Sequence, residues 1–340
     1  MTKLTFVLLL LSLTAMVSCR RFRAAGKDDG KAPETVFNDG VQVADDLVLR
    51  DAARGRDVPL KIYYPPATAM GGGQMPVILF SHGSGASKEQ YEYLGRHWAA
   101  QGYVSVHLTH FGSDLSVIKD KPRLSAMSEL REASNDTLNI HARPRDISFV
   151  IDSFDEIEKR VPALKGKLSR SQIGVAGHSF GSNTTLLVAG ARLYEPDGVK
   201  TFSDARVKAF VALSPQGTGR LGITKDSWQP IAAPVLLMTG TEDKGMDGGE
   251  DYLWRLESYN GLSAGNKYLV VIAGATHLTF AGQAPKRSGA SIDPAHLAYI
   301  TRITTEFWSL YLEPQPDAKT FFTPSAFAAF SNGQATLQMK

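Results

Sequence analysis

One stretch of the chain decides the fold: residues 173–187, which read IGVAGHSFGSNTTLL. An apolar run leads into the motif Gly177-x-Ser179-x-Gly181, and a helical pattern follows it. A serine at the tip of a sharp strand-to-helix turn adopts a strained backbone conformation, and side chains at the flanking positions would collide with the neighbouring strand or helix. The glycines therefore predict a nucleophile elbow that presents the Ser179 hydroxyl. An ordinary glycine-rich turn is the alternative, and the strand and helix on either side argue against it.

Apolar strand patterns alternate with helical patterns over residues 76–311, which predicts a mainly parallel, doubly wound α/β sheet. Two further strand patterns precede them and read as an antiparallel pair. We expect one domain over residues 41–312. The expected strands are 41–49, 58–64, 76–80, 103–108, 173–178, 207–213, 234–239 and 268–272, and the expected helices include 88–101, 147–159, 252–258 and 294–311.

Residues 113–140 are polar, poorly periodic and long for a simple connection. They predict either a small lid over the site or a plain surface excursion, and the sequence leaves both open. The helix that follows is expected over 147–159, with Pro144 suited to its start. Residues 313–340 show no clear pattern, and we assign them to a C-terminal tail.

The N-terminal residues predict export. Residues 1–18 read as a signal peptide, because a lysine precedes an apolar run that is too short for a convincing membrane span. Cys19, the only cysteine, ends the segment AMVSC, which resembles the lipobox of bacterial lipoproteins. That resemblance implies acylation of Cys19 and anchoring to a membrane of the bacterial cell envelope, with residues 19–40 as a tether. Plain secretion or a periplasmic location is the alternative, and a single cysteine leaves no partner for a disulfide within the chain.

The composition of the chain and the motifs that it lacks argue against several classes of function. The net charge is +3 with 21% charged residues, which gives no reason to expect a nucleic-acid partner. The chain has no H-E-x-x-H motif, no phosphate-binding glycine loop and no dinucleotide fingerprint. The pair His107-x-x-His110 has no third ligand type nearby. We therefore expect neither a cofactor nor a metal.

A serine hydroxyl needs a general base to become nucleophilic, and the base needs an acid that holds it in the right tautomer. In folds of this kind the acid follows a late strand and the histidine follows the next one. Asp243 lies just past the strand pattern 234–239, and His277 lies just past 268–272. They are the predicted triad partners of Ser179, although Glu242 and Asp247 are close competitors for the acid.

The oxyanion that forms when serine attacks a carbonyl needs preorganised N–H donors. One expected donor is the backbone N–H of Phe180, which follows the nucleophile at the start of a helix. The other is the backbone N–H of Ser84 in the turn His82-Gly83-Ser84-Gly85, which ends the strand pattern 76–80. The side chains of His82 and His178 are expected to have packing or hydrogen-bonding roles.

Several of these motifs together resemble Ser-dependent α/β-hydrolases. Within that group the chain is similar to bacterial proteins labelled as predicted dienelactone hydrolases and to platelet-activating-factor acetylhydrolases. The matching stretches are 80–85 (FSHGSG), 102–104 (GYV), 143–146 (RPRD), 177–181 (GHSFG), 240–243 (GTED) and 274–277 (GATH).

The resemblance implies a carboxylic-ester hydrolase that works through a Ser-His-Asp triad and an acyl-enzyme intermediate, and the N-terminal segment predicts that it is exported. True dienelactone hydrolases have a cysteine nucleophile where this chain has Ser179, so that particular activity is not implied. Two alternatives stay open: an amidase or peptidase of the same fold, and a non-catalytic envelope-binding lipoprotein with a dormant hydrolase fold.

Overall fold

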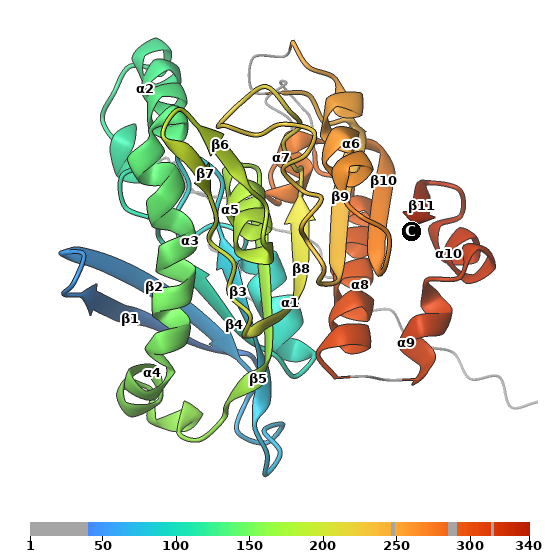
Figure 1. The fold of residues 1–340 in the computed structure, drawn as a ribbon. Coiled ribbons are helices and arrows are strands. Elements are labelled where there is room, and N and C mark those ends of the chain that lie inside the picture. Colours follow the sequence, from blue (N-terminus) through green and yellow to red (C-terminus); the bar gives the residue numbers. More distant parts are fainter. Residues whose placement is uncertain (1–39, 246–248, 285–290, 314–315) are drawn as a thin grey trace, which may run out of the picture. The chain divides into compact units, whose positions relative to one another are not determined.

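A computed structural model describes residues 40–245, 249–284, 291–313 and 316–340 (Figure 1). The expected signal peptide 1–18, Cys19 and nearly all of the tether 19–40 lie outside these ranges, so their assignments stay predictions. Asn38–Lys340 form one compact unit. None of the helices within the described ranges combines the length and apolar character of a membrane span.

The described residues form a central sheet with strand order β1-β2-β4-β3-β5-β8-β9-β10-β11. Neighbouring strands from β4 to β10 in this order are parallel, whereas β1 and β2 pair in antiparallel fashion at one edge. The predicted fold class is therefore confirmed. The strands are β1 (Gln42–Asp51), β2 (Arg56–Tyr64), β3 (Met75–Ser81), β4 (Val104–Leu108), β5 (Leu168–His178), β8 (Val207–Leu213), β9 (Val235–Glu242), β10 (Lys267–Thr276) and β11 (Ala335–Met339), with a separate hairpin of β6 (Leu193–Glu195) and β7 (Gly198–Lys200).

Helices cover both faces of the sheet (Figure 1). The helices are α1 (Glu92–Ala100), α2 (Arg123–Asn135), α3 (Thr137–Asp152), α4 (Phe154–Arg160), α5 (Phe180–Ala189), α6 (Tyr252–Gly261), α7 (His277–Phe280), α8 (Pro294–Tyr311), α9 (Pro316–Phe321) and α10 (Pro324–Ser331), with short 3-10 turns at Leu115–Val117 and Pro162–Leu164.

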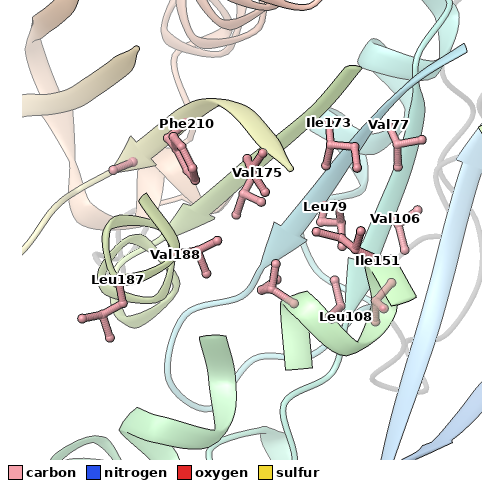
Figure 2. Close-up of a cluster of buried hydrophobic side chains, with 14 of the residues drawn as sticks. Val77, Leu79, Val106, Leu108, Ile151, Ile173, Val175, Leu187, Val188 and Phe210 are labelled. Atoms are coloured by element: carbon pink, nitrogen blue, oxygen red, sulfur yellow. The ribbon is translucent and has the colours of Figure 1, made fainter. Parts of the chain in front are cut away.

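The core forms two layers because successive residues of a strand point to opposite faces. Leu79 of β3 packs on the face covered by α3, α5 and α6, and Figure 2 shows part of this layer, including Ile151 of α3. Its neighbour Ile78 packs on the other face against Trp98 of α1 and Trp308 of α8. Strands buried on both faces explain the continuous apolar runs in the sequence.

The structure corrects the expected start of the helix after residue 140. Helix α3 begins at Thr137 and runs through Pro144, instead of beginning near Pro144. Asp136 caps its first turn by accepting a hydrogen bond from the Leu138 N–H at 2.9 Å. A proline inside a helix costs about 3 kcal/mol. Burial of the apolar face that includes Ile147 and Val150 offsets this cost.

Two other elements differ from the sequence-based expectation. Helix α1 begins at Glu92 instead of residue 88, because Tyr91 is in the left-handed region with φ 67°. The segment expected as a tail contains α9, α10 and β11, and β11 pairs in antiparallel fashion with β10 at the sheet edge. The sheet therefore extends past Leu312, where we expected the domain to end. Most of β11 lies at the surface, so its sequence lacks the apolar run of a central strand.

Candidate active site

The turn between β5 and α5 has the strained geometry that the glycine pattern predicts. Ser179 lies at φ 56° and ψ −117°, between the last residue of β5 and the first residue of α5. A Cβ on Gly177 would overlap the Gly181 carbonyl, and a Cβ on Gly181 would overlap the Ser81 carbonyl of β3. Glycine is therefore required on both sides of the serine.

The structure brings together the three side chains that the sequence analysis singled out. The His277 Nε2 atom lies 3.0 Å from the Ser179 Oγ atom, and its Nδ1 atom lies 2.9 Å from Asp243 Oδ1. Asp243 follows β9 and is fully buried, whereas the His277 side chain is 30% exposed. With the proton on Nδ1 donated to Asp243, Nε2 can accept the hydrogen bond from the Ser179 hydroxyl.

Asp243 is the acid next to His277. Burial favours the neutral acid, but the hydrogen bond from His277 and the charge of Arg255 outweigh burial and lower the pKa of Asp243 to about 2. Thr239 of β9 also donates a hydrogen bond to the second carboxylate oxygen of Asp243 at 2.9 Å. The neighbouring Glu242 is exposed, and Asp247 lies outside the described residues.

Sequence reasoning missed Arg255, which organises the loop that carries Asp243. Its Nε atom lies 2.8 Å from Asp243 Oδ1, and Nη2 lies 3.1 Å from His277 Nδ1. The remaining N–H groups donate to the carbonyls of Ser214 and Pro215 after β8 and of Lys244 after β9. A single arginine in an expected helix is usually a solvent-exposed side chain, so nothing in the sequence indicates that Arg255 is buried at the site.

The two expected oxyanion donors belong to residues near Ser179: Ser84 lines a pocket together with Ser179, and Phe180 follows Ser179 directly. The Gly83 N–H donates to the Tyr91 hydroxyl at 3.1 Å, and the Gly85 N–H donates to the Ser113 carbonyl at 2.9 Å. The Ser84 N–H between them has no hydrogen bond to any of the described residues. Phe180 is the first residue of α5, where backbone N–H groups have no partner within the helix.

Two pockets meet at Ser179 and His277. One pocket also contains Ser84 and is lined by apolar side chains such as Leu115, Ile118 and Leu130. The other is lined mostly by polar side chains, including Ser134, Asn135 and Gln216, together with Trp254. Part of the segment 113–140 therefore lines both pockets. The assignment of this segment as a lid remains a prediction.

The other histidines are built into the framework of the site. Nδ1 of His178 lies 2.9 Å from the Tyr91 hydroxyl and Nε2 lies 3.1 Å from the His277 carbonyl. Burial lowers the pKa of His178 well below its usual value, so its ring is neutral. The His82 ring accepts a hydrogen bond from the His110 N–H at 2.9 Å. Among the described residues, no three His, Cys, Asp or Glu side chains cluster as metal ligands.

A second serine, histidine and aspartate form a similar series beneath the site. Nε2 of His110 lies 2.9 Å from the Ser81 hydroxyl, and Nδ1 lies 2.9 Å from Asp146 Oδ2. All three side chains are fully buried. Asp146 also pairs with Arg54 and Arg56. The sequence analysis did not connect these residues, which belong to β3, the loop after β4 and α3.

Comparisons with known proteins agree with the fold. No family model matches the chain. The chain is 28% identical over 196 residues to the α/β-hydrolase gkaG of Penicillium citrinum, covering 57% of this chain and 35% of the relative. It is 27% identical over 141 residues to a platelet-activating factor acetylhydrolase of Canis lupus familiaris, covering 34% and 32%. The α/β-hydrolase xenA of Xenoacremonium sinensis is 26% identical over 182 residues, covering 53% and 35%.

The chain therefore spans about a third of the length of the curated relatives it matches. With the sheet topology, these similarities confirm the predicted resemblance to α/β-hydrolase esterases and the α/β-hydrolase fold. The names of the relatives support a hydrolase and leave its substrate open.

Proposed function

We propose that this protein is a serine hydrolase that cleaves carboxylic esters through an acyl-enzyme intermediate. One observation carries the proposal: an unbroken hydrogen-bond series from buried Asp243 through His277 to Ser179, which ends on a strained elbow where two pockets meet. This combination supplies a nucleophile, a base and two cavities beside the nucleophile.

In the proposed reaction, the Ser179 Oγ atom bonds to the acyl carbon while His277 Nε2 takes the hydroxyl proton. The ionised Asp243 holds the imidazole in the required tautomer and stabilises the imidazolium. The ester C–O bond then breaks, and His277 returns the proton to the departing alcohol. Water attacks the acyl-enzyme with His277 again as base, which releases the carboxylic acid and restores Ser179.

The backbone N–H groups of Phe180 and Ser84 are the proposed oxyanion donors. Their support is that neither has a hydrogen-bond partner among the described residues, while the flanking N–H groups of Gly83 and Gly85 are already used. Loss of one such donor typically costs about 3 kcal/mol of the activation barrier. The reaction draws on protein groups and water alone, so we propose no cofactor.

Activity assays distinguish this proposal from its two rivals. The expected result is covalent labelling by a fluorophosphonate in wild type but not in Ser179→Ala, with faster turnover of p-nitrophenyl acetate than of p-nitroacetanilide. Faster turnover of the anilide would favour an amidase. Failure of folded wild-type protein to label would favour a dormant fold. A series of p-nitrophenyl esters of increasing acyl length then defines the acyl preference.

We also propose export and anchoring of the protein to a membrane through lipidated Cys19. The support is the lipobox-like AMVSC segment after an apolar run. Metabolic labelling with an alkyne fatty acid in a bacterial host should mark the wild type and not Cys19→Ala. Release of both proteins into the medium without label would instead indicate plain secretion.

A further inference from the structure

Arg143 of α3 is a fully buried arginine whose hydrogen bonds all go to uncharged groups. Its Nε donates to Thr184 Oγ1 at 3.0 Å, Nη1 to Ser113 Oγ at 2.8 Å, and Nη2 to Ser81 Oγ at 3.1 Å and to the His82 carbonyl. Burying a guanidinium is costly unless its donors are satisfied. The partners of Arg143 belong to the two segments that carry the proposed oxyanion donors, which suggests a role for a buried guanidinium at this position.

One set of partners holds the loop that carries Ser84. The His82 carbonyl lies two residues before Ser84. The Ser113 side chain binds Arg143, while the Ser113 carbonyl accepts the N–H of Gly85 at 2.9 Å. The guanidinium therefore anchors the loop immediately before Ser84 and, through Ser113, immediately after it.

The other set of partners holds the helix that carries Phe180. Thr184 lies in the first turns of α5, and the centre of the guanidinium lies 4.4 Å from the centre of the Phe180 ring. The negative face of an aromatic ring attracts a cation placed over it, and the attraction is stronger when the pair is shielded from water. The contact between Arg143 and the Phe180 ring therefore helps to fix the position of Phe180, whose backbone N–H is a proposed oxyanion donor.

We propose that Arg143 is a positioning residue that fixes the Ser84 and Phe180 N–H groups relative to each other. This inference rests on the proposed function. Arginine suits this task because its donors lie in one rigid plane and reach partners on both sides. Oxyanion stabilisation depends on donors already in place when charge develops, so a small change in their separation weakens it.

The test compares Arg143→Met and Arg143→Lys with Arg206→Met, a half-exposed arginine paired with Asp204 that serves as the matched control. Fluorophosphonate titration counts intact sites, so that kcat refers to folded enzyme alone. We expect kcat for p-nitrophenyl acetate to fall about 10- to 100-fold in Arg143→Met with little change in KM, since donor loss costs up to 10³-fold. Arg143→Lys should fall between this variant and wild type.

A second readout reports on the oxyanion site itself. A thionoester develops negative charge on sulfur, which is larger than oxygen and fits closely placed donors poorly. The preference for the ester over the matched thionoester should therefore shrink in Arg143→Met and stay unchanged in Arg206→Met. A residue that only stabilised the fold would lower the number of titrated sites without changing this ratio.

Less disruptive substitutions allow the inference to be tested even if the Arg143→Met variant does not fold. Ser113→Ala and Thr184→Val each remove one partner of Arg143 and should lower kcat a few-fold with the same shift in the ester-to-thionoester ratio. Unchanged kcat per titrated site and an unchanged ratio in Arg143→Lys, Ser113→Ala and Thr184→Val would overturn the inference. If folded wild type neither labels nor turns over esters, the proposed function itself fails.

Discussion

The molecule contains two Ser-His-Asp series with nearly the same spacing and different surroundings. In the series Ser179–His277–Asp243 the two hydrogen-bond distances are 3.0 and 2.9 Å, and in Ser81–His110–Asp146 both are 2.9 Å. Distances alone do not separate them. What separates them is the backbone at the serine, access to the site and the other groups bound to the acid.

Ser179 lies on a strained elbow and lines two pockets, whereas Ser81 is the last residue of β3 and has no exposed surface. Arg143 donates to the Ser81 oxygen, so that oxygen already serves as an acceptor. Asp146 also binds Arg54 and Arg56, which joins α3 to the strand pair β1–β2. The comparison teaches that a hydrogen-bonded triad becomes a candidate catalyst only with an open serine and free N–H donors nearby.

Replacing the serine of each series should give the largest difference in activity between the two series. Ser179→Ala should lower kcat for p-nitrophenyl acetate by about 10⁴-fold or more, because the nucleophile is lost. Ser81→Ala should keep kcat within a few-fold of wild type and cost about 2 kcal/mol of unfolding free energy, because the hydroxyl's two hydrogen bonds, with His110 and Arg143, are lost. Steady-state kinetics and urea unfolding of both variants check this. Equal kinetic losses in the two variants would break the distinction.

Paired acid substitutions should separate chemistry from stability. Asp243→Asn should lower kcat about 10⁴-fold by favouring the wrong imidazole tautomer. Asp146→Asn should mainly destabilise the fold, by on the order of 3 kcal/mol, because it removes the charge partner of Arg54 and Arg56 from a buried position. Urea unfolding and kcat per fluorophosphonate-titrated site provide the measurements. A larger kcat loss in Asp146→Asn than in Asp243→Asn would reverse the assignment.

The pH dependence of stability gives the smallest and most selective contrast. Burial and the charge of Arg143, with a smaller effect of Arg56, lower the pKa of His110 from 6.5 to about 4, although Asp146 opposes the shift. As pH falls from 6.5 to 4, the unfolded state binds a proton that the folded state excludes. His110 should therefore lower the free energy of unfolding by about 1.4 kcal/mol for each unit by which the pH decreases in this range.

Replacing His110 tests this expectation. Urea unfolding at pH 7, 6 and 5 measures how the free energy of unfolding depends on pH. This free energy should fall less steeply with decreasing pH in His110→Gln than in wild type, and the difference should be the contribution of one histidine. The other buried histidines, such as His107, still contribute in both proteins. An unchanged slope would mean that the folded protein accommodates a charged His110.

Much of the fold and of the candidate site could be predicted from local sequence patterns. Gly177 and Gly181 meet a steric requirement that acts within a few residues, so their spacing predicts the turn at Ser179. Apolar runs predict strands, and parallel strands place their carboxyl ends at one edge, which is why Asp243 and His277 could be singled out. The amphipathic pattern of α8, over Pro294–Tyr311, matched the structure to the residue.

Other features depend on contacts between distant parts of the chain. The sequence predicted Asp243 as the acid but left Glu242 as a close competitor, because which of the two side chains turns toward His277 depends on where β9 ends relative to its neighbours. It also could not show that α3 continues through Pro144, since the buried face of the helix, not its propensity, offsets the cost of the proline.

By itself, the sequence determined where the chain turns sharply and which serine is placed on that turn, because steric exclusion acts over a few neighbouring residues. Only the tertiary structure decided which buried charges support the site. Arg143 and Arg255 look like surface residues in the sequence and lie in the interior of the fold. Burying a charge is tolerated only when partners from several elements meet around it, and those partners come together only when the chain has folded.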